Sequence, residues 1–409
     1  MIIDQTTATA LGVNTARLAY LDAFLTKAAS DMINPAIAIT VAYKDVEIFN
    51  GAYGPSSPGG PPLKLDMITD VQSVTKPFTA TAIMLLQEDG LLEIKEPLQN
   101  FFPDFAGEYK EEVVLWQLMS HVSGMSDDAV KAHVSAVIKE TLGENAPGQD
   151  APWAAWEDAV KTVSRMQGLT EAEIEKESWN QFWLRIGLGA PLANRPNTQF
   201  DYSSEGYNLL ASLVEKLAGE SMDAFLTRRV FAPLGMVDSH FVLPEEKWPR
   251  VLLRGDTGKG GRWMDSDENK VEWGGSSGLK TTMPDLLRFG LMFYHLGTWD
   301  GVRILSPASV RMMSRDHNKE IPKSWWHGKW YQSNWGLGWN VRQGKFDSLN
   351  SLRSDRTYDH AGWGGARLMI DPDNDLVAAY YMVDAEGSDE DNAYALHAKT
   401  ANIIYSALG

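Results

Sequence analysis

A serine and a lysine three residues apart, Ser73 and Lys76, are the pair in this sequence best suited to chemistry. They stand at the opening of a strongly apolar stretch, residues 77–86, which is typical of a helix buried in a core. Residues three apart on a helix are neighbours, so the hydroxyl and the amine would share one face. Burial lowers the pKa of a lysine from about 10.4, and a neutral amine can take the proton of a serine hydroxyl. The pair therefore predicts a serine nucleophile and its lysine base.

The same S-x-x-K spacing occurs again at Ser277 and Lys280. In a chain of this length, about one such match is expected by chance. The context of each copy favours the first. Ser73 leads directly into the apolar helix, whereas Ser277 lies in a glycine-rich turn and the next helix is predicted only from Thr282. The alternative for Ser73 is a helix cap followed by a surface lysine.

The elements around the serine are predicted from periodicity and turn residues. Apolar spacing indicates a helix at 15–29, with Asn14 as its N-cap, and two strands at 36–43 and 46–53. The remaining predictions are helices at 151–163, 170–186, 206–218, 225–230, 282–296 and 391–408, and strands at 271–273, 335–341, 367–370 and 376–383. Together they predict a protein of mixed helices and strands, in which the last hundred residues form sheet followed by a terminal helix.

Two further polar residues lie in predicted loops. His121 is part of Ser120-His121-Val122-Ser123-Gly124, and a histidine near a loop more often makes a structural hydrogen bond than does chemistry. Tyr202 belongs to a loop that feeds the helix at 206–218, and its alternative role is packing. The irregular stretch 127–191 between them is rich in tryptophan, which we interpret as an insertion that forms a helical cap.

Composition limits the class of partner. The chain has 409 residues, 44% of them hydrophobic, which is enough for two domains or one large domain. With 54 acidic and 37 basic residues the net charge is −17, so nucleic acid and anionic membrane surfaces are unlikely partners. No apolar run approaches the roughly 20 residues of a membrane span, and no signal peptide is recognisable. We expect a soluble, cytoplasmic protein.

The sequence predicts no cofactor and no metal. The absence of cysteine rules out disulfides, thiol nucleophiles and thiolate metal sites. The segment Asp371-Pro372-Asp373-Asn374-Asp375 resembles the start of a calcium loop, but Leu376 stands where that loop needs glycine, so we predict a hairpin turn. The expected partner is a small-molecule ester or amide substrate, and the oligomeric state is left open.

Several motifs in a fixed order resemble one family of enzymes. They are Ser73-Val74-Thr75-Lys76, Leu118 to Gly124, Tyr202-Ser203-Ser204 leading into Gly206 to Leu210, and His360-Ala361-Gly362. This order is similar to that of serine hydrolases related to class C β-lactamases, which include family VIII carboxylesterases, D-aminopeptidases and DD-peptidases. The likeness extends from about Thr15 to Leu408. It implies an α+β fold, an α/β/α sandwich in which helices flank an antiparallel sheet of the β-lactamase/transpeptidase type.

The resemblance also implies roles for individual residues. Ser73 would attack the acyl carbon, while Lys76 and Tyr202 would share its proton and pass it to the leaving group. The strand that begins at His360 would edge the site, and the backbone N–H groups of Ser73 and Trp363 would form the oxyanion hole. Gly362 would allow close approach of substrate to that strand.

Two departures from the family pattern bear on the substrate. Ser204 stands where related β-lactamases and peptidases usually carry asparagine, and its side chain is shorter. His360 replaces the lysine typical of β-lactamases, so a fixed positive charge is missing there. We therefore predict a carboxylesterase, with an amidase, peptidase or β-lactamase of the same fold as the alternative. Tryptophans could line an apolar pocket or pack in the core; they are Trp325, Trp326, Trp330, Trp335 and Trp339.

Two other interpretations remain at this stage. The segment Gly274-Gly275-Ser276-Ser277-Gly278 matches the nucleophile elbow of α/β-hydrolases, with Asp359 and His360 downstream in the required chain order. The elbow needs a helix immediately after Ser276, however, and the sequence delays that helix to Thr282. The chain could also be a binding protein that keeps the fold without activity.

The predicted domain organisation has two parts. Residues 1–105 and 265–409 form a sheet-containing α/β domain. Residues 106–264 form a mainly helical region that includes the insertion at 127–191. The active site is predicted between the two parts.

Overall fold

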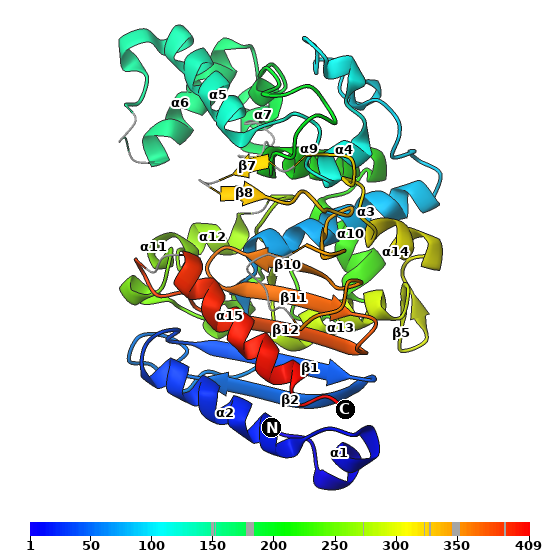
Figure 1. Ribbon diagram of the computed structural model, residues 1–409. Helices are drawn as coiled ribbons and strands as arrows, with labels where there is room; N and C mark the ends of the chain where they lie inside the picture. The colour runs from blue at the N-terminus through cyan, green and yellow to red at the C-terminus, as the bar shows by residue number, and fades with distance from the viewer. Residues whose placement is uncertain are drawn as a thin grey trace.

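A six-stranded antiparallel sheet is the centre of the fold (Figure 1). In the computed structural model, residues 1–148, 151, 153–176, 184–272, 274–322, 324–326, 329–345, 352–387 and 390–409 are described. The sheet order is β2 (Val46–Tyr53), β1 (Ile37–Tyr43), β12 (Leu376–Met382), β11 (Ala366–Asp371), β10 (Tyr358–Gly362) and β9 (Asn340–Val341). The first two strands therefore pair with the last ones, and residues near both ends of the chain build one sheet.

Helices cover both faces of the sheet. On one face, the long helices α2 and α15 lie side by side and bury apolar residues against β1, β2 and β12. On the other face, α13 packs on β11 and β12, and α3 lies between the sheet and the helical region (Figure 1). This two-faced cover confirms the antiparallel sheet flanked by helices, because each face of a sheet needs an apolar partner layer.

The described helices have the following bounds. They are α1 Gln5–Leu11, α2 Thr15–Ser30, α3 Lys76–Glu88, α4 Leu115–Met119, α5 Asp127–Leu142, α6 Trp153–Met166, α7 Glu171–Lys176, α9 Ser204–Ala218, α10 Met222–Leu226, α11 Gly261–Met264, α12 Asp267–Val271, α13 Met283–Tyr294, α14 Pro307–Met313 and α15 Glu390–Tyr405. Two-stranded pairs join β3 Thr69–Asp70 to β4 Lys280–Thr281, β5 Thr298–Trp299 to β6 Val302–Arg303, and β7 Ser324–Trp326 to β8 Lys329–Tyr331.

Local signals in the sequence fix many of these boundaries. The Asn14 side chain accepts a hydrogen bond from the N–H of Arg17 and caps α2, and Thr282 caps α13 in the same way through Asp285. Helix α9 ends at Gly219, which has a φ of 70°. The turn after Asp371 joins β11 to β12, so the hairpin prediction is confirmed there.

Two predicted strands were wrong in the described residues. Residues 335–339 do not belong to the sheet, and only Asn340–Val341 forms β9, because Trp335 turns toward the helical region and packs against His121. In the predicted strand 271–273, Val271 is instead the last residue of helix α12. Residue 273 of that strand and residues 177–183 of the helix predicted at 170–186 lie outside the described residues.

The helical region stands beside the sheet and contains α4, α5, α6, α7 and α9 (Figure 1). Helix α3 packs on α9, and one apolar core runs from α5 and α9 through α3 to the sheet. The proposed domain boundaries at residues 105 and 264 stay a prediction. Of the described helices, none combines the length and the apolar character that a membrane crossing requires.

Candidate active site

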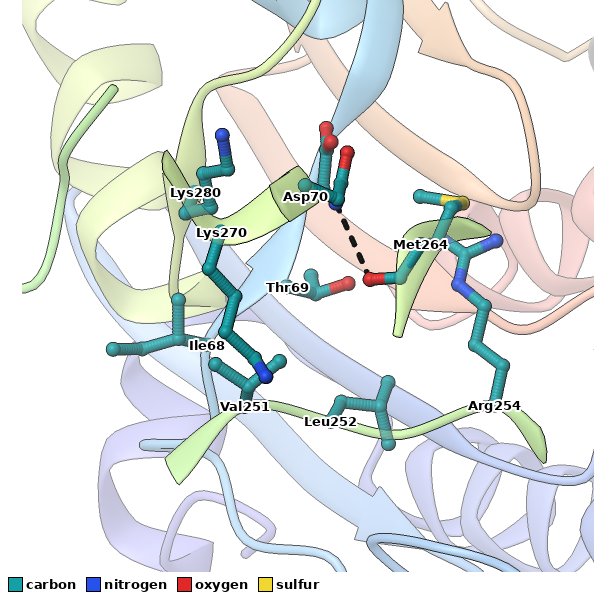
Figure 2. Close-up of a pocket in the computed structure, with 10 residues that line it drawn as sticks. Ile68, Thr69, Asp70, Val251, Leu252, Arg254, Met264, Lys270 and Lys280 are labelled. Carbon is teal, nitrogen blue, oxygen red and sulfur yellow. Dashed lines mark hydrogen bonds between the residues drawn. The ribbon is translucent and has the colours of Figure 1, made fainter. Parts of the chain in front are cut away.

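The turn that carries Ser73 is fixed by a buried carboxylate. Ser73 lies in the 3-10 turn Gln72–Thr75, which runs into α3 and has Gln72 at a φ of 49°. Asp70 Oδ1 accepts a hydrogen bond from the backbone N–H of Gln72 at 2.7 Å, which supports this unusual conformation. Figure 2 shows Asp70 among the residues that line a small cavity, together with Arg254 and Met264. The serine therefore stands on a rigid support while its own side chain stays partly exposed.

Lys76 is the group best placed to act on Ser73. Its Nζ lies 3.1 Å from Ser73 Oγ and donates a hydrogen bond at 3.0 Å to the carbonyl of Ser276. The side chain is 0% exposed. Burial lowers the pKa of Lys76 from 10.5 to about 7, although the carboxylates of Asp127 and Glu205 act in the opposite direction. Near neutral pH a large share of this lysine is therefore an uncharged amine.

The Ser276 carbonyl is held in place from two helices. Thr79 Oγ1 on α3 donates to the carbonyl of Gly275 at 2.6 Å, and Asn208 Oδ1 on α9 accepts from the N–H of Ser276 at 3.1 Å. A Cβ on Gly275 would lie 2.2 Å from the carbonyl oxygen of Tyr207, so only glycine allows this close approach. The segment is therefore clamped between α3 and α9, with one carbonyl aimed at Lys76.

This arrangement excludes the nucleophile-elbow alternative. Residues 274–277 form a tight turn in which Gly274 and Ser277 exchange backbone hydrogen bonds. Strand β4 follows the turn, and helix α13 begins only at Met283. The elbow requires a strand, the serine and then a helix, with the serine at the edge of a parallel sheet. Here Ser276 supplies a carbonyl to another residue's amine instead.

Tyr202 lies over Lys76 and is held by an aromatic neighbour. The Nζ of Lys76 is 4.7 Å from the centre of the Tyr202 ring. The His121 ring stacks on Tyr202 at 4.3 Å and 28°, and Trp335 packs edge-on against His121 at 5.1 Å. The structure thus brings Ser73 and Lys76, at the start of α3, together with Tyr202 from the loop before α9.

His121 has a structural hydrogen bond, as predicted from its loop position. Its Nδ1 accepts from the backbone N–H of Ser203 at 3.0 Å, and its own φ is 61°. Burial, with the nearby Lys76 and His360 charges, holds the pKa of His121 well below 6.5. The neutral ring therefore carries its proton on Nε2.

The third motif lies on β10, at the edge of the site. His360 Nδ1 donates to the carbonyl of Ala361 at 2.8 Å, because a carbonyl oxygen only accepts. Burial lowers the pKa of His360 to about 3, with a further contribution from Lys76. His360 is therefore a neutral ring near pH 7, and the Tyr202 ring is 6.4 Å away.

Close packing joins β10 to the nucleophile turn. A Cβ on Gly362 would lie 2.0 Å from the carbonyl oxygen of Val71, two residues before Ser73. Glycine at this position lets the strand approach the turn. The next residue, Trp363, is 44% exposed, and Lys259 Nζ lies 5.5 Å from its ring. The backbone of residue 363 therefore lies in the turn that follows β10, next to the strand end that packs on Val71.

Ser204 is the first residue of α9, and its backbone N–H donates to both carboxylate oxygens of Asp127 at 2.8 and 3.0 Å. Of the tryptophans, Trp339 packs in the core with Phe293 and Tyr358, while Trp335 packs on His121. The side chains of Trp325, Trp326 and Trp330 lie outside the described residues. In the parts of the chain that are described, no group of three or more His, Cys, Asp or Glu side chains is arranged to hold a metal ion.

Sequence reasoning missed three contributors to the site. They are the Ser276 carbonyl with its partner Asn208, the Thr79 hydroxyl, and the Asp127 carboxylate. None of them stands at a motif spacing from Ser73. The one usable signal was the glycine pair before Ser276, which indicated close backbone approach.

Comparison with known proteins places this chain in a family. The beta-lactamase family profile matches residues 24–402, which is nearly the whole chain. The chain belongs to the beta-lactamase family of serine hydrolases. Within this family, penicillin-binding protein 4 of Amycolatopsis lactamdurans is 28% identical over 328 residues, which is 77% of this chain and 71% of that protein. The resemblance inferred from the motifs is therefore confirmed.

Solved structures confirm the fold of this beta-lactamase family member. A family VIII carboxylesterase superposes with a TM-score of 0.69 at 15% identity, covering 95% of this chain and 97% of the other. A penicillin-binding protein homologue from Caulobacter crescentus gives a TM-score of 0.67 at 18% identity, with 94% and 97% covered. Identities this low establish the fold but leave the substrate open.

Proposed function

We propose that this protein is a carboxylesterase that hydrolyses small esters through an acyl-enzyme on Ser73. The observation that carries the proposal is the pairing of a partly exposed Ser73 hydroxyl with a fully buried Lys76 amine 3.1 Å away. Burial brings the pKa of Lys76 to about 7, which suits a general base at neutral pH. Neither the proposed chemistry nor the residues require a cofactor.

In the proposed acylation, Ser73 Oγ attacks the ester carbonyl while Lys76 accepts the hydroxyl proton. A neutral amine has two N–H donors and one lone pair. One N–H is donated to the Ser276 carbonyl, so the lone pair is free to face the Ser73 hydroxyl. Tyr202, next to Lys76, would carry the proton on to the leaving alcohol. The tetrahedral intermediate then collapses with loss of that alcohol.

The proposed oxyanion hole consists of backbone N–H groups from Ser73 and Trp363. The close contact of Gly362 with Val71 supports it, since this packing brings the two chain segments together. Backbone donors held rigidly cost no reorganisation as charge develops on the oxygen. In deacylation, water attacks the acyl carbon and gives its proton to Lys76 or Tyr202. The bond from the acyl carbon to Ser73 Oγ then breaks, the proton passes to Oγ, and the acid leaves.

Two observations favour an ester over a β-lactam or a peptide. His360 is neutral near pH 7, so it supplies no fixed positive charge for a substrate carboxylate. The Ser204 backbone N–H is engaged with Asp127, and its short side chain offers little reach toward a substrate amide. The structural likeness to a family VIII carboxylesterase agrees with this choice but does not decide it.

Covalent labelling tests the nucleophile. A fluorophosphonate should add once to the protein, peptide mapping should find the adduct on Ser73, and Lys76→Ala should abolish the labelling. An adduct on Ser276 would overturn the assignment. Folded protein that takes up no label would favour the non-catalytic alternative.

Substrate ranking tests the specificity. Short-chain aryl esters should be hydrolysed at least about 100-fold faster, in kcat/KM, than a chromogenic cephalosporin. If the cephalosporin is the better substrate, the esterase proposal is wrong and the β-lactamase alternative replaces it.

A further inference from the structure

Asp127 connects the helical region to the segment that carries Tyr202. It is the first residue of α5, yet its carboxylate lies at the start of α9, more than 70 residues later in the chain. Its Oδ1 accepts hydrogen bonds from Ser203 Oγ at 2.9 Å, from the Ser204 N–H at 2.8 Å and from the Glu205 N–H at 3.0 Å. One side chain therefore binds three consecutive residues, 203 to 205, at the start of α9.

These hydrogen bonds provide acceptors for the backbone N–H groups at the N-terminus of helix α9. The first N–H groups of an α-helix have no partner within the helix, and a negative charge there is favourable. Asp127 takes the N–H groups of Ser204 and Glu205, and the Ser203 side chain takes that of Gly206 at 3.2 Å. Asp127 also stands in the first turn of its own helix, so its charge faces two helix N-termini. Its position is accordingly well determined by hydrogen bonding.

The same segment fixes Tyr202 from the other side. Tyr202 immediately precedes Ser203, whose backbone N–H donates to His121 Nδ1. The His121 ring in turn stacks on Tyr202, which lies over Lys76. Asp127 on one flank and His121 on the other therefore hold the backbone from which Tyr202 projects.

Asp127 also acts on the charge of Lys76. Burial in the apolar helix disfavours the ammonium form, the Tyr202 and Tyr207 rings face the amine, and the nearby His121 and His360 rings are neutral because burial lowers their pKa. Asp127 and Glu205 are the carboxylates that favour the ammonium and so raise the pKa of Lys76. Loss of the Asp127 charge would release the Lys76 proton at a lower pH.

We propose that Asp127 is a positioning residue of this active site: it anchors the start of α9 and thereby holds Tyr202 against Lys76. This inference rests on the proposed serine-hydrolase function. It assigns a role to the first residue of the segment 127–191, which sequence reasoning treated as an insertion. Asp127 touches no reacting atom, so its effect must pass through Tyr202 and Lys76.

The test compares two neighbouring carboxylates. Asp127→Asn removes the charge and part of the acceptor capacity, whereas Asp128→Asn changes an exposed residue one position further along the same helix. For each variant, the rate constant of Ser73 phosphonylation and the kcat/KM for an aryl ester are measured from pH 5 to pH 9. Circular dichroism and a thermal melt establish that each variant is folded.

Asp127→Asn is expected to lower the plateau of both rates by about 10- to 100-fold, because misplacing a catalytic group by a fraction of an ångström has effects of this order. The acid limb of its pH profile, where the rate falls as Lys76 gains a proton, should move to lower pH. Loss of helix capping alone would not cause this shift. Asp128→Asn should match the wild type in both respects. Ser203→Ala, which removes the side-chain link to Asp127 and the cap for the Gly206 N–H but keeps the Asp127 charge, should lower the plateau less and leave the acid limb in place.

The outcomes separate the two proposals. If the wild type takes up no label on Ser73, the proposed function fails. If the wild type is labelled and Asp127→Asn reacts with the same plateau and the same acid limb, the role of Asp127 is overturned while the function stands. If Asp127→Asn does not fold at the assay temperature, Ser203→Ala decides: a rate equal to that of the wild type overturns the anchoring role.

Discussion

The chain contains two S-x-x-K pairs, which differ in their secondary structure and in their contacts. Ser73 and Lys76 lie on one helical turn, and the amine reaches the hydroxyl at 3.1 Å. Ser277 lies in a turn, and Lys280 lies on the short strand β4, with Asp70 as its partner across the β3–β4 pair. The Nζ of Lys280 donates to the carbonyls of Phe241 and Glu272. The same spacing in the sequence therefore brings the lysine amine to the serine hydroxyl in the first pair, whereas in the second pair the amine binds backbone carbonyls.

The comparison also shows that a lowered lysine pKa does not identify a base. Burial brings the pKa of Lys76 to about 7 and that of Lys280 to about 8. The side chain of Lys280 is only 2% exposed, so both amines are desolvated alike. What distinguishes Lys76 is a partly exposed serine within reach. Geometry, rather than proton affinity, assigns the role.

Replacing the two serines should give the largest contrast. Ser73→Ala is expected to lower kcat by at least about 10⁴-fold, because loss of a nucleophile removes the covalent route. Ser277→Ala should retain the wild-type rate, since Ser277 belongs to a turn that needs only its backbone. Steady-state hydrolysis of an aryl ester measures both. Comparable losses in the two variants would contradict the assignment of Ser73.

Replacing the two lysines should separate catalysis from stability. Lys76→Arg keeps the positive charge but cannot become neutral, so the rate should fall by about 10²- to 10⁴-fold while the protein stays folded. Lys280→Met removes the hydrogen bonds that Nζ donates to the carbonyls of Phe241 and Glu272, which should lower the free energy of unfolding by about 1–3 kcal/mol. Urea unfolding and the rate per phosphonate-titratable site measure these effects. Retained activity in Lys76→Arg would remove Lys76 as the base.

One hydrogen bond that holds the segment of Ser276 in place comes from Asn208 on α9, and a substitution there can remove it. Asn208→Leu removes the acceptor for the Ser276 N–H, so the carbonyl that orients Lys76 should shift and kcat should fall by about 10- to 100-fold. Asn34 is a matched control, because its buried amide donates to the carbonyls of Met382 and Val383 at the end of β12. Asn34→Leu should lower the melting temperature without changing the rate per folded molecule. Equal rates per folded molecule for the two variants would show that the clamp has no effect on catalysis.

The pH dependence should be the smallest of these effects and should follow Lys76. Because burial brings its pKa to about 7, kcat/KM should rise with pH as the amine loses its proton, and it should be about tenfold below the plateau at pH 6. The rise should reach its midpoint near pH 7, below the value of about 8 that burial gives Lys280. The rate constant of Ser73 phosphonylation by a fluorophosphonate should show the same rise with pH, and product release does not contribute to it. A wild-type rate that does not change between pH 6 and pH 8 would show that Lys76 is not the group that titrates.

Much of the fold could be predicted because its signals are local. The N-caps Asn14 and Thr282 act within three residues, and the strands at 37–43 and 46–53 alternate or run apolar as expected. Residues 335–339 were mistaken for a strand because apolar residues there bury aromatic side chains without pairing to the sheet. Periodicity cannot separate these two reasons for apolar character.

The sequence by itself determined the Ser73–Lys76 pair, since both residues lie on one turn and the apolar stretch after them predicts burial. It also determined the family, through the order of several short motifs. Only the tertiary structure decided which atoms surround the lysine. The carbonyl of Ser276 comes from 200 residues away, and the carboxylate of Asp127 joins a helix that starts more than 70 residues later. Such contacts depend on how helices and strands pack together, and packing between distant segments leaves no fixed spacing in the chain.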